Sequence, residues 1–89
     1  MQTIKYVKQP VAVVVTVSRD GQVRPKKFQW KDGNTYTIDR VTKVERAAST
    51  KVGGCGIRYT AMVEGLPRFL YDEEGKWFME DEVLIEVTE

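Results

Sequence analysis

The chain has 89 residues, of which 42% are hydrophobic and 30% are charged, so we expect one small folded domain over residues 1–89. It contains no histidine and one cysteine, Cys55, which excludes zinc sites built on these residues, histidine-dependent nucleophile pairs and an intramolecular disulfide. The longest apolar run, residues 11–15, is far shorter than the roughly 20 residues that cross a bilayer. Because the N-terminus also lacks a signal-peptide pattern, we expect a cytoplasmic protein that does not bind membranes.

Alternation with a period of two predicts strands in the first part of the chain. Residues 11–18 form a β-branched apolar run, which indicates a strand buried on both faces. An Asp-Gly turn follows, and its hairpin partner over residues 23–30 should lie at a sheet edge near Pro25, because proline donates no ladder hydrogen bond. A second Asp-Gly pair at residues 32–33 and the alternating residues 35–38 complete a three-stranded meander.

Residues 39–48 leave two alternatives open. They could form one short helix capped by Asp39, with their apolar residues on one face. They could also continue the preceding strand with a β-bulge near Arg40, where the alternation breaks. Because valine and threonine lose side-chain freedom in a helix, we favour the bulged strand. Residues 49–56 are small and glycine-rich, and they predict a mobile loop.

The last third of the chain predicts further strands. Residues 57–64 show the clearest alternation of apolar and polar side chains. An acidic turn at 72–75 separates residues 68–71 from 76–79, and residues 83–87 add a final strand. The predicted fold class is therefore all-β, a small antiparallel barrel or strongly curled sheet of six to seven strands, with one short helix near 39–48 as the alternative.

Charge is divided unevenly along the chain. Residues 1–60 contain twelve Lys and Arg against four acidic residues, a net charge of +8, whereas residues 61–89 contain two against nine, a net charge of −7. If the two segments occupy different faces, the nearly neutral chain is a dipole. If the acidic strands lie beside the basic ones, cross-strand ion pairs cancel much of the field.

A basic strand with aromatic neighbours has the composition that binds single-stranded nucleic acid, because cations neutralise phosphates and rings stack on bases. Phe28 and Trp30 lie among the lysines of residues 23–31, although alternation places the rings opposite Lys27 and so favours a core position for them. We expect a non-enzymatic binding module. The favoured partner is nucleic acid, bound by the basic face. The alternative partner is a protein or a second copy, docked by opposed basic and acidic faces. The candidate nucleic-acid-binding residues are Arg24, Lys26, Lys27, Lys31, Arg46, Lys51 and Arg58.

The sequence predicts no catalytic residue, metal ligand or cofactor. The glycine-rich residues 51–56 lack the spacing of a phosphate-binding loop, and Cys55 has no histidine to activate it, so a hairpin loop and an inert packing residue are favoured. Most carboxylates lie in predicted turns, away from any cleft that would create an acid–base pair. The three adjacent acids at 80–82 indicate a solvated turn rather than a Ca²⁺ or Mg²⁺ site.

Residues 23–80 resemble a family of small bacterial domains of unknown function. The pattern Pro-x-x-Phe-x-Trp-x-x-Gly-x-x-Tyr-x-Ile runs from Pro25 to Ile38, Arg58-Tyr59-Thr60 matches a central strand, and Gly-x-Trp-Phe spans residues 75–78. Some relatives in that family are encoded beside polymerases of the DNA-damage response, so the resemblance implies a nucleic-acid-binding or DNA-repair accessory role. The matching positions are mostly apolar or turn residues, so the resemblance concerns the fold and implies no catalytic chemistry.

Overall fold

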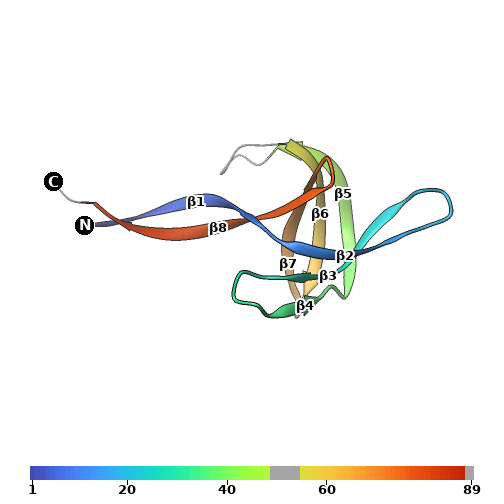
Figure 1. Ribbon diagram of the computed structural model, residues 1–89, viewed down its shortest axis with the longest axis horizontal. Helices are drawn as coiled ribbons and strands as arrows, with labels where there is room; N and C mark the ends of the chain where they lie inside the picture. Colours follow the sequence, from blue (N-terminus) through green and yellow to red (C-terminus); the bar gives the residue numbers. More distant parts are fainter. Residues whose placement is uncertain (49–54, 88–89) are drawn as a thin grey trace.

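The computed structural model describes residues 1–48 and 55–87, and its regular elements are all β-strands (Figure 1). In chain order they are β1 (Gln2–Pro10), β2 (Ala12–Val17), β3 (Val23–Gln29), β4 (Thr35–Thr37), β5 (Arg40–Ala48), β6 (Cys55–Val63), β7 (Leu66–Glu73) and β8 (Lys76–Glu86). They form an antiparallel five-stranded sheet, ordered β1-β8-β7-β6-β5, and an antiparallel three-stranded sheet, ordered β2-β3-β4. The predicted all-β class is confirmed. Where six to seven strands in one barrel or curled sheet were expected, the described residues form eight strands in two sheets without a closed barrel.

Residues 40–48 form a strand, β5, and the alternative of a short helix was wrong. The pairing of β5 with β6 shifts register between Val41 and Lys43, so Thr42 is the extra residue of a β-bulge. The hydroxyl of Thr42 donates a hydrogen bond of 3.4 Å to the carbonyl oxygen of Thr60. The favoured alternative is confirmed as a bulged strand, because β-branched side chains fit a pleated strand better than a helix. It does not continue the preceding strand, since β4 ends at Thr37 and belongs to the other sheet. The expected loop at 49–56 lies largely outside the described residues.

The acidic residues 80–82 lie inside β8, so the expectation of a solvated turn was wrong. Along this part of β8, Glu80, Asp81 and Glu82 face Lys8, Val7 and Tyr6 of β1. The sequence patterns did not indicate β1. Pairing with this strand supplies hydrogen-bond partners for the backbone of the acidic run and so keeps it extended. The described part of the chain contains no helix that is long and apolar enough to span a membrane.

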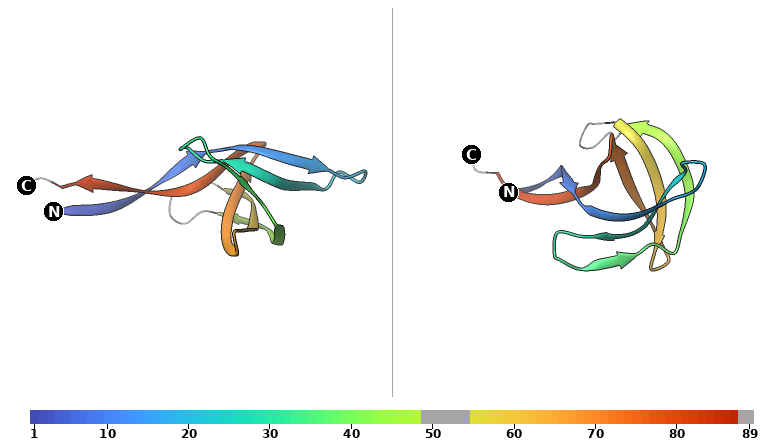
Figure 2. Two further views of the ribbon diagram at one scale, coloured as in Figure 1. Left: turned by 90° about the horizontal axis from the view of Figure 1, so that it is seen from below. Right: turned by 45° about the vertical axis from the view of Figure 1, so that its right-hand side comes forward.

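Residues 2–7 of β1 and residues 81–86 of β8 form a two-stranded ribbon, which we call the arm. Strand β8 pairs with β7 only from Lys76 to Phe78, whereas its pairing with β1 continues to Glu86. The arm therefore leaves the sheet and projects from the body of the molecule, with the N-terminus at its tip (Figures 1 and 2). Its projection explains the elongated shape, which measures 57 × 25 × 20 Å.

The core lies where the three-stranded sheet crosses one face of the larger sheet (Figure 2). Its buried residues come from β3, the β4–β5 connection, β6, β7 and β8: Phe28, Ile38, Tyr59, Ala61, Val63, Leu70 and Met79. Two backbone hydrogen bonds attach the β4–β5 connection to both sheets, from Ile38 N to Lys26 O of β3 at 2.9 Å and from Asp39 N to Met62 O of β6 at 2.8 Å. The core position expected for Phe28 and Trp30 is therefore confirmed for Phe28 of β3, while Trp30, which follows β3, packs against the core and is only half-buried.

Strand β2 differs from the expectation of a strand buried on both faces. It is the edge strand of the three-stranded sheet, and Val14 and Val17 are exposed. The neighbouring β3 has β2 on one side and β4 on the other, but the β4 pairing stops at Lys27. Pro25 thus lies in a stretch of β3 that lacks its second neighbour, which suits a residue with no amide hydrogen.

Candidate functional site

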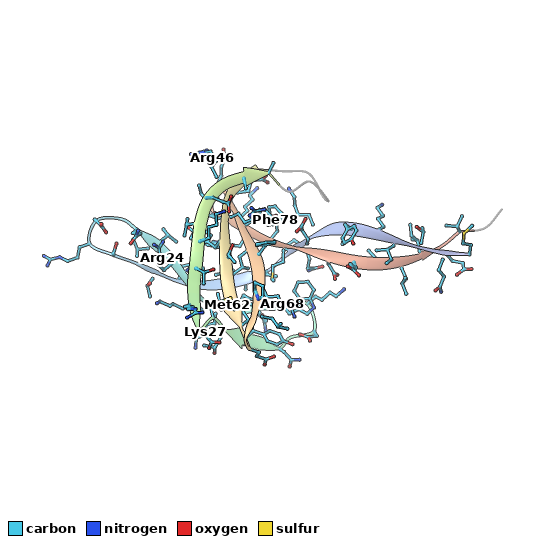
Figure 3. All side chains as sticks on the ribbon, turned by 180° about the vertical axis from the view of Figure 1, so that it is seen from behind. Arg24, Lys27, Arg46, Met62, Arg68 and Phe78 are labelled. Carbon is cyan, nitrogen blue, oxygen red and sulfur yellow. The ribbon has the colours of Figure 1, made fainter. Side chains whose placement is uncertain are left out.

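The basic residues predicted to bind nucleic acid lie on separate parts of the molecule. Strand β3 carries Arg24, Lys26 and Lys27, the β3–β4 turn carries Lys31, β5 carries Arg46, and β6 carries Arg58, while Lys51 lies outside the described residues. In Figure 3, Arg46 lies at one end of β5 and Lys27 lies near the other end. The structure therefore brings the three residues of β3 together and does not bring Arg46 to them.

Arg58 is engaged on the outer face of the larger sheet. Its guanidinium lies 3.1 Å from the carboxylate of Glu45 and 4.7 Å from the ring centroid of Phe69. A hydrogen bond with Tyr71 and, next in size, one with Glu45 raise the pKa of Arg58, and the hydrogen bond from Arg58 lowers the pKa of Glu45. These contacts place Arg58 in a cross-strand network that stabilises β5, β6 and β7.

Ion pairs also join the basic and acidic segments of the chain. Lys31 pairs with Asp81, and Lys8 lies 3.2 Å from Glu73. Each of these pairs links a base from the first two-thirds of the sequence to an acid from the last third. The cancellation of charge across strands is therefore partly realised, as the second of the two charge alternatives expects.

The basic surface that remains is centred on β3. Lys26 and Lys27 are exposed, and no carboxylate of residues 1–48 or 55–87 forms an ion pair with them, with Arg24 or with Arg46. Arg24 is half-buried and donates a hydrogen bond of 3.1 Å to the carbonyl oxygen of Val23. Phe28, the aromatic residue next to Lys27 in the chain, is buried in the core and offers no ring for a base to stack on.

A cleft of about 640 Å³, which we call the acidic cleft, opens between the β3–β4 segment, the β6–β7 turn and the base of the arm. Its apolar lining consists of Tyr6, Phe28, Trp30, Tyr36, Val63, Leu66, Pro67, Phe69 and Met79. Its charged lining consists of four carboxylates, Glu64, Glu80, Asp81 and Glu82, and one guanidinium, Arg68. A second hollow of about 460 Å³ shares Tyr36 and Glu64 with it and adds the carboxylate of Asp39. The concavity therefore combines aromatic side chains with an excess of negative charge.

The aromatic side chains of the cleft are held by defined contacts. Tyr36 stacks on the buried Phe28 with a centroid distance of 5.5 Å and an interplanar angle of 23°. The backbone at Trp30 is fixed by hydrogen bonds of 2.9 Å from Trp30 N to Asn34 O and from Gly33 N to Trp30 O. These contacts preorganise the rings, which lowers the entropy cost of binding a ligand between them.

The cleft lies beside a lysine of its own chain. In the part of the chain that the structure describes, no group of three or more His, Cys, Asp or Glu side chains could hold a metal ion. The Lys31 ammonium lies 5.8 Å from the ring centroid of Trp30 while it pairs with Asp81. Trp30 and Asp81, which both line the cleft, thus contact a cation of their own chain.

Sequence reasoning did not identify the acidic cleft. Its residues come from four separate segments of the chain, so no local motif marks it. The signals that were available are the aromatic residues Trp30 and Tyr36 and the acidic run at 80–82, which only the fold brings together.

The chain was compared with family models, with curated proteins and with solved structures, and none of these comparisons gave a match. The resemblance of residues 23–80 to a domain family of unknown function therefore stays a prediction. The function of this chain has to be argued from the arm, the acidic cleft and the basic residues of β3.

Proposed function

We propose that this chain is a non-enzymatic protein-interaction module that associates with a second copy through its arm. The observation that carries the proposal is the exposure of apolar side chains on a two-stranded ribbon. Ile4 and Leu84 face each other across the arm and are 53% and 66% exposed, and Val83 and Ile85, which alternate with Leu84 along β8, are exposed on the opposite face. A two-stranded ribbon is marginally stable in water, and exposed apolar clusters mark interaction surfaces.

The pairing geometry of the arm favours a second copy as the partner. Side chains alternate between the two faces of a ribbon, so Ile4 and Leu84 share one face and Lys5 points to the other. When two arms pack face to face about a two-fold axis that runs along them, β1 of each copy lies over β8 of the other. This arrangement covers Ile4 with Leu84 of the second copy.

Measuring the mass of the full chain in solution by sedimentation equilibrium tests this proposal. We expect a dimer that dissociates in the double variant Ile4→Thr/Leu84→Thr, because threonine retains strand propensity and removes about 2 to 4 kcal/mol of apolar burial per arm. The matched control is Val14→Thr/Val17→Thr in β2, where the two valines are 55% and 62% exposed, and it should remain dimeric. A wild-type chain that is monomeric at high micromolar concentration contradicts the proposal, as does dissociation of the control.

Nucleic-acid binding is the second candidate function, and the observation that favours it is the exposure of Lys26 and Lys27 of β3, which form no ion pair within residues 1–48 and 55–87. Fluorescence anisotropy with a labelled oligothymidine at two salt concentrations tests it. We expect affinity to fall with salt with a logarithmic slope of about −0.7 per phosphate contacted. Lys26→Glu/Lys27→Glu should abolish binding, and Arg19→Glu/Lys76→Glu, with the same change of charge elsewhere, should retain it. Absence of binding at low salt contradicts this function, and unchanged binding by the Lys26/Lys27 variant contradicts the site.

A further inference from the structure

Beyond self-association through the arm, we infer that the acidic cleft binds a lysine or arginine side chain presented by a partner protein. The first reason is charge. Four carboxylates and one guanidinium line the cleft, and the adjoining hollow adds Asp39. A phosphate or an acidic peptide entering this concavity meets like charges, whereas a cation is attracted.

The second reason is the aromatic lining. Trp30 is half-buried, so part of its side chain remains accessible, and the ring of Tyr36 is held by its stacking on Phe28. The faces of such rings attract ammonium and guanidinium groups, more strongly where water is partly excluded, and nearby carboxylates add a Coulombic attraction of their own. An apolar groove alone would accept any hydrophobic side chain. The combination of rings and carboxylates selects a long side chain with an apolar stem and a cationic end.

The third reason is the behaviour of the chain's own Lys31. Its ammonium pairs with Asp81 and lies within cation–π distance of Trp30, so a cation is already stabilised at one side of the cleft. Glu64 and Glu82 are exposed at the rim and form no ion pair with the described residues. These two carboxylates are the groups that an incoming cation would meet.

Glu64 has a matched counterpart outside the cleft. Glu64 precedes Gly65 in the β6–β7 turn and Glu74 precedes Gly75 in the β7–β8 turn, and both glutamates have φ of 52°. The two turns lie at opposite ends of β7, and Glu74 does not line either hollow. The same substitution at the two positions therefore makes the same change in charge and in local backbone preference, and differs only in the cleft.

The experiment is an NMR titration of the full chain with a blocked Gly-Lys-Gly tripeptide and with its Nε-acetylated form. Trp30 and Trp77 are the two tryptophans, and Trp77 packs against Tyr59 outside the cleft with a centroid distance of 5.2 Å. We expect the lysine peptide to shift the indole N–H signal of Trp30 with saturation and to leave that of Trp77 in place. The acetylated peptide should produce no saturable shift. Glu64→Gln should weaken binding about two- to fivefold, and Glu74→Gln should leave it unchanged.

Four results would overturn the inference. These are no shift of Trp30 with the lysine peptide at millimolar concentration, equal binding of the acetylated peptide, an equal effect of Glu64→Gln and Glu74→Gln, or a shift of Trp30 by oligothymidine alone. The second result would indicate an uncharged apolar groove, and the last would indicate nucleic acid. The arm variant Ile4→Thr/Leu84→Thr should bind the peptide with unchanged affinity. The experiments can therefore reject dimerisation through the arm and lysine binding by the cleft independently of each other.

Discussion

Gly56 in β6 is the glycine whose replacement tests the packing of the larger sheet most directly. A Cβ added at this position would lie 2.3 Å from the carbonyl oxygen of Asp72 and 3.1 Å from Cα of Glu73. Ordinary van der Waals contact at such a site begins at 3.4 Å. Both obstructing atoms belong to the backbone of β7, which the adjacent pairing of Ile57 with Asp72 holds in place. The substitution Gly56→Ala therefore forces β6 and β7 apart at their ends.

The size of the effect follows from this overlap. Overpacking by one methyl group costs about 1 to 3 kcal/mol when the surroundings cannot move. Total stability for a chain of this length is about 4 to 13 kcal/mol, and each kcal/mol changes Tm by about 4 to 8 °C in a domain of this size. We expect Gly56→Ala to lower Tm by about 4 to 24 °C. The direction of the change in Tm is informative, because alanine in place of glycine at an unobstructed position raises stability by reducing the conformational entropy of the unfolded chain.

Thermal unfolding followed by circular dichroism measures this change. The control is Gly75→Asn in the β7–β8 turn, where φ is 86° and no heavy atom lies within 4 Å of an added Cβ. Asparagine tolerates this left-handed backbone, so the control should lose less than about 1 kcal/mol. A Gly56→Ala variant that melts within 2 °C of the wild type would refute the close approach of β6 to the backbone of β7.

Two further predictions concern stability. The hydrogen bond from Arg58 lowers the pKa of Glu45, so the stability from this pair is present above the unfolded pKa of the carboxyl and is lost as pH falls through its folded pKa. Melting curves from pH 7 to pH 3 should show this loss, and it should be smaller in Glu45→Gln. Glu74→Asn relieves a left-handed backbone conformation at an exposed turn position and should stabilise the chain by about 0.5 to 1 kcal/mol, measured by urea unfolding. An unchanged or lower urea midpoint would contradict the claim that the backbone conformation of Glu74 is strained.

Local patterns in the sequence were sufficient for the strands that follow tight turns. The Asp-Gly pairs at residues 20–21 and 32–33 place glycine where φ is 85° and 87°, and the strands on either side form as expected. The broken alternation near Arg40 was likewise sufficient to indicate the bulge that the structure has at Thr42. These features depend on neighbours in the chain, which is why they can be predicted from it.

The arm could not be predicted in the same way, because its pairing joins the two ends of the described chain. Gln2 pairs with Glu86, and neither strand has the apolar alternation of a half-buried strand throughout its length. The acidic run at 80–82 has the composition of a solvated turn, and only its pairing with β1 keeps it extended. Tertiary context overrides local preference here, as is common for strands.

The candidate sites likewise depend on long-range contacts that local sequence patterns do not show. The composition of residues 23–31 indicated a basic strand, and Lys26 and Lys27 are exposed there as a phosphate-binding strand requires. The sequence could not show that Lys31 turns towards Asp81, because residues 50 positions apart in the chain meet only in the fold. The same contact helps to form the acidic cleft, so the residue predicted to bind phosphate lies beside a site for cations.

The division of charge along the chain therefore produces neither a simple dipole nor a complete cancellation of charge between strands. Pairing of the first strand with the last brings basic and acidic segments together, and part of their charge cancels at Lys8–Glu73 and Lys31–Asp81. What does not cancel is local, with an excess of base on β3 and an excess of acid in the cleft. Salt weakens binding at both surfaces, so salt dependence alone cannot identify the partner. Charge reversal on β3 and charge removal at Glu64 act on different surfaces, and the variant that loses binding identifies which surface the partner uses.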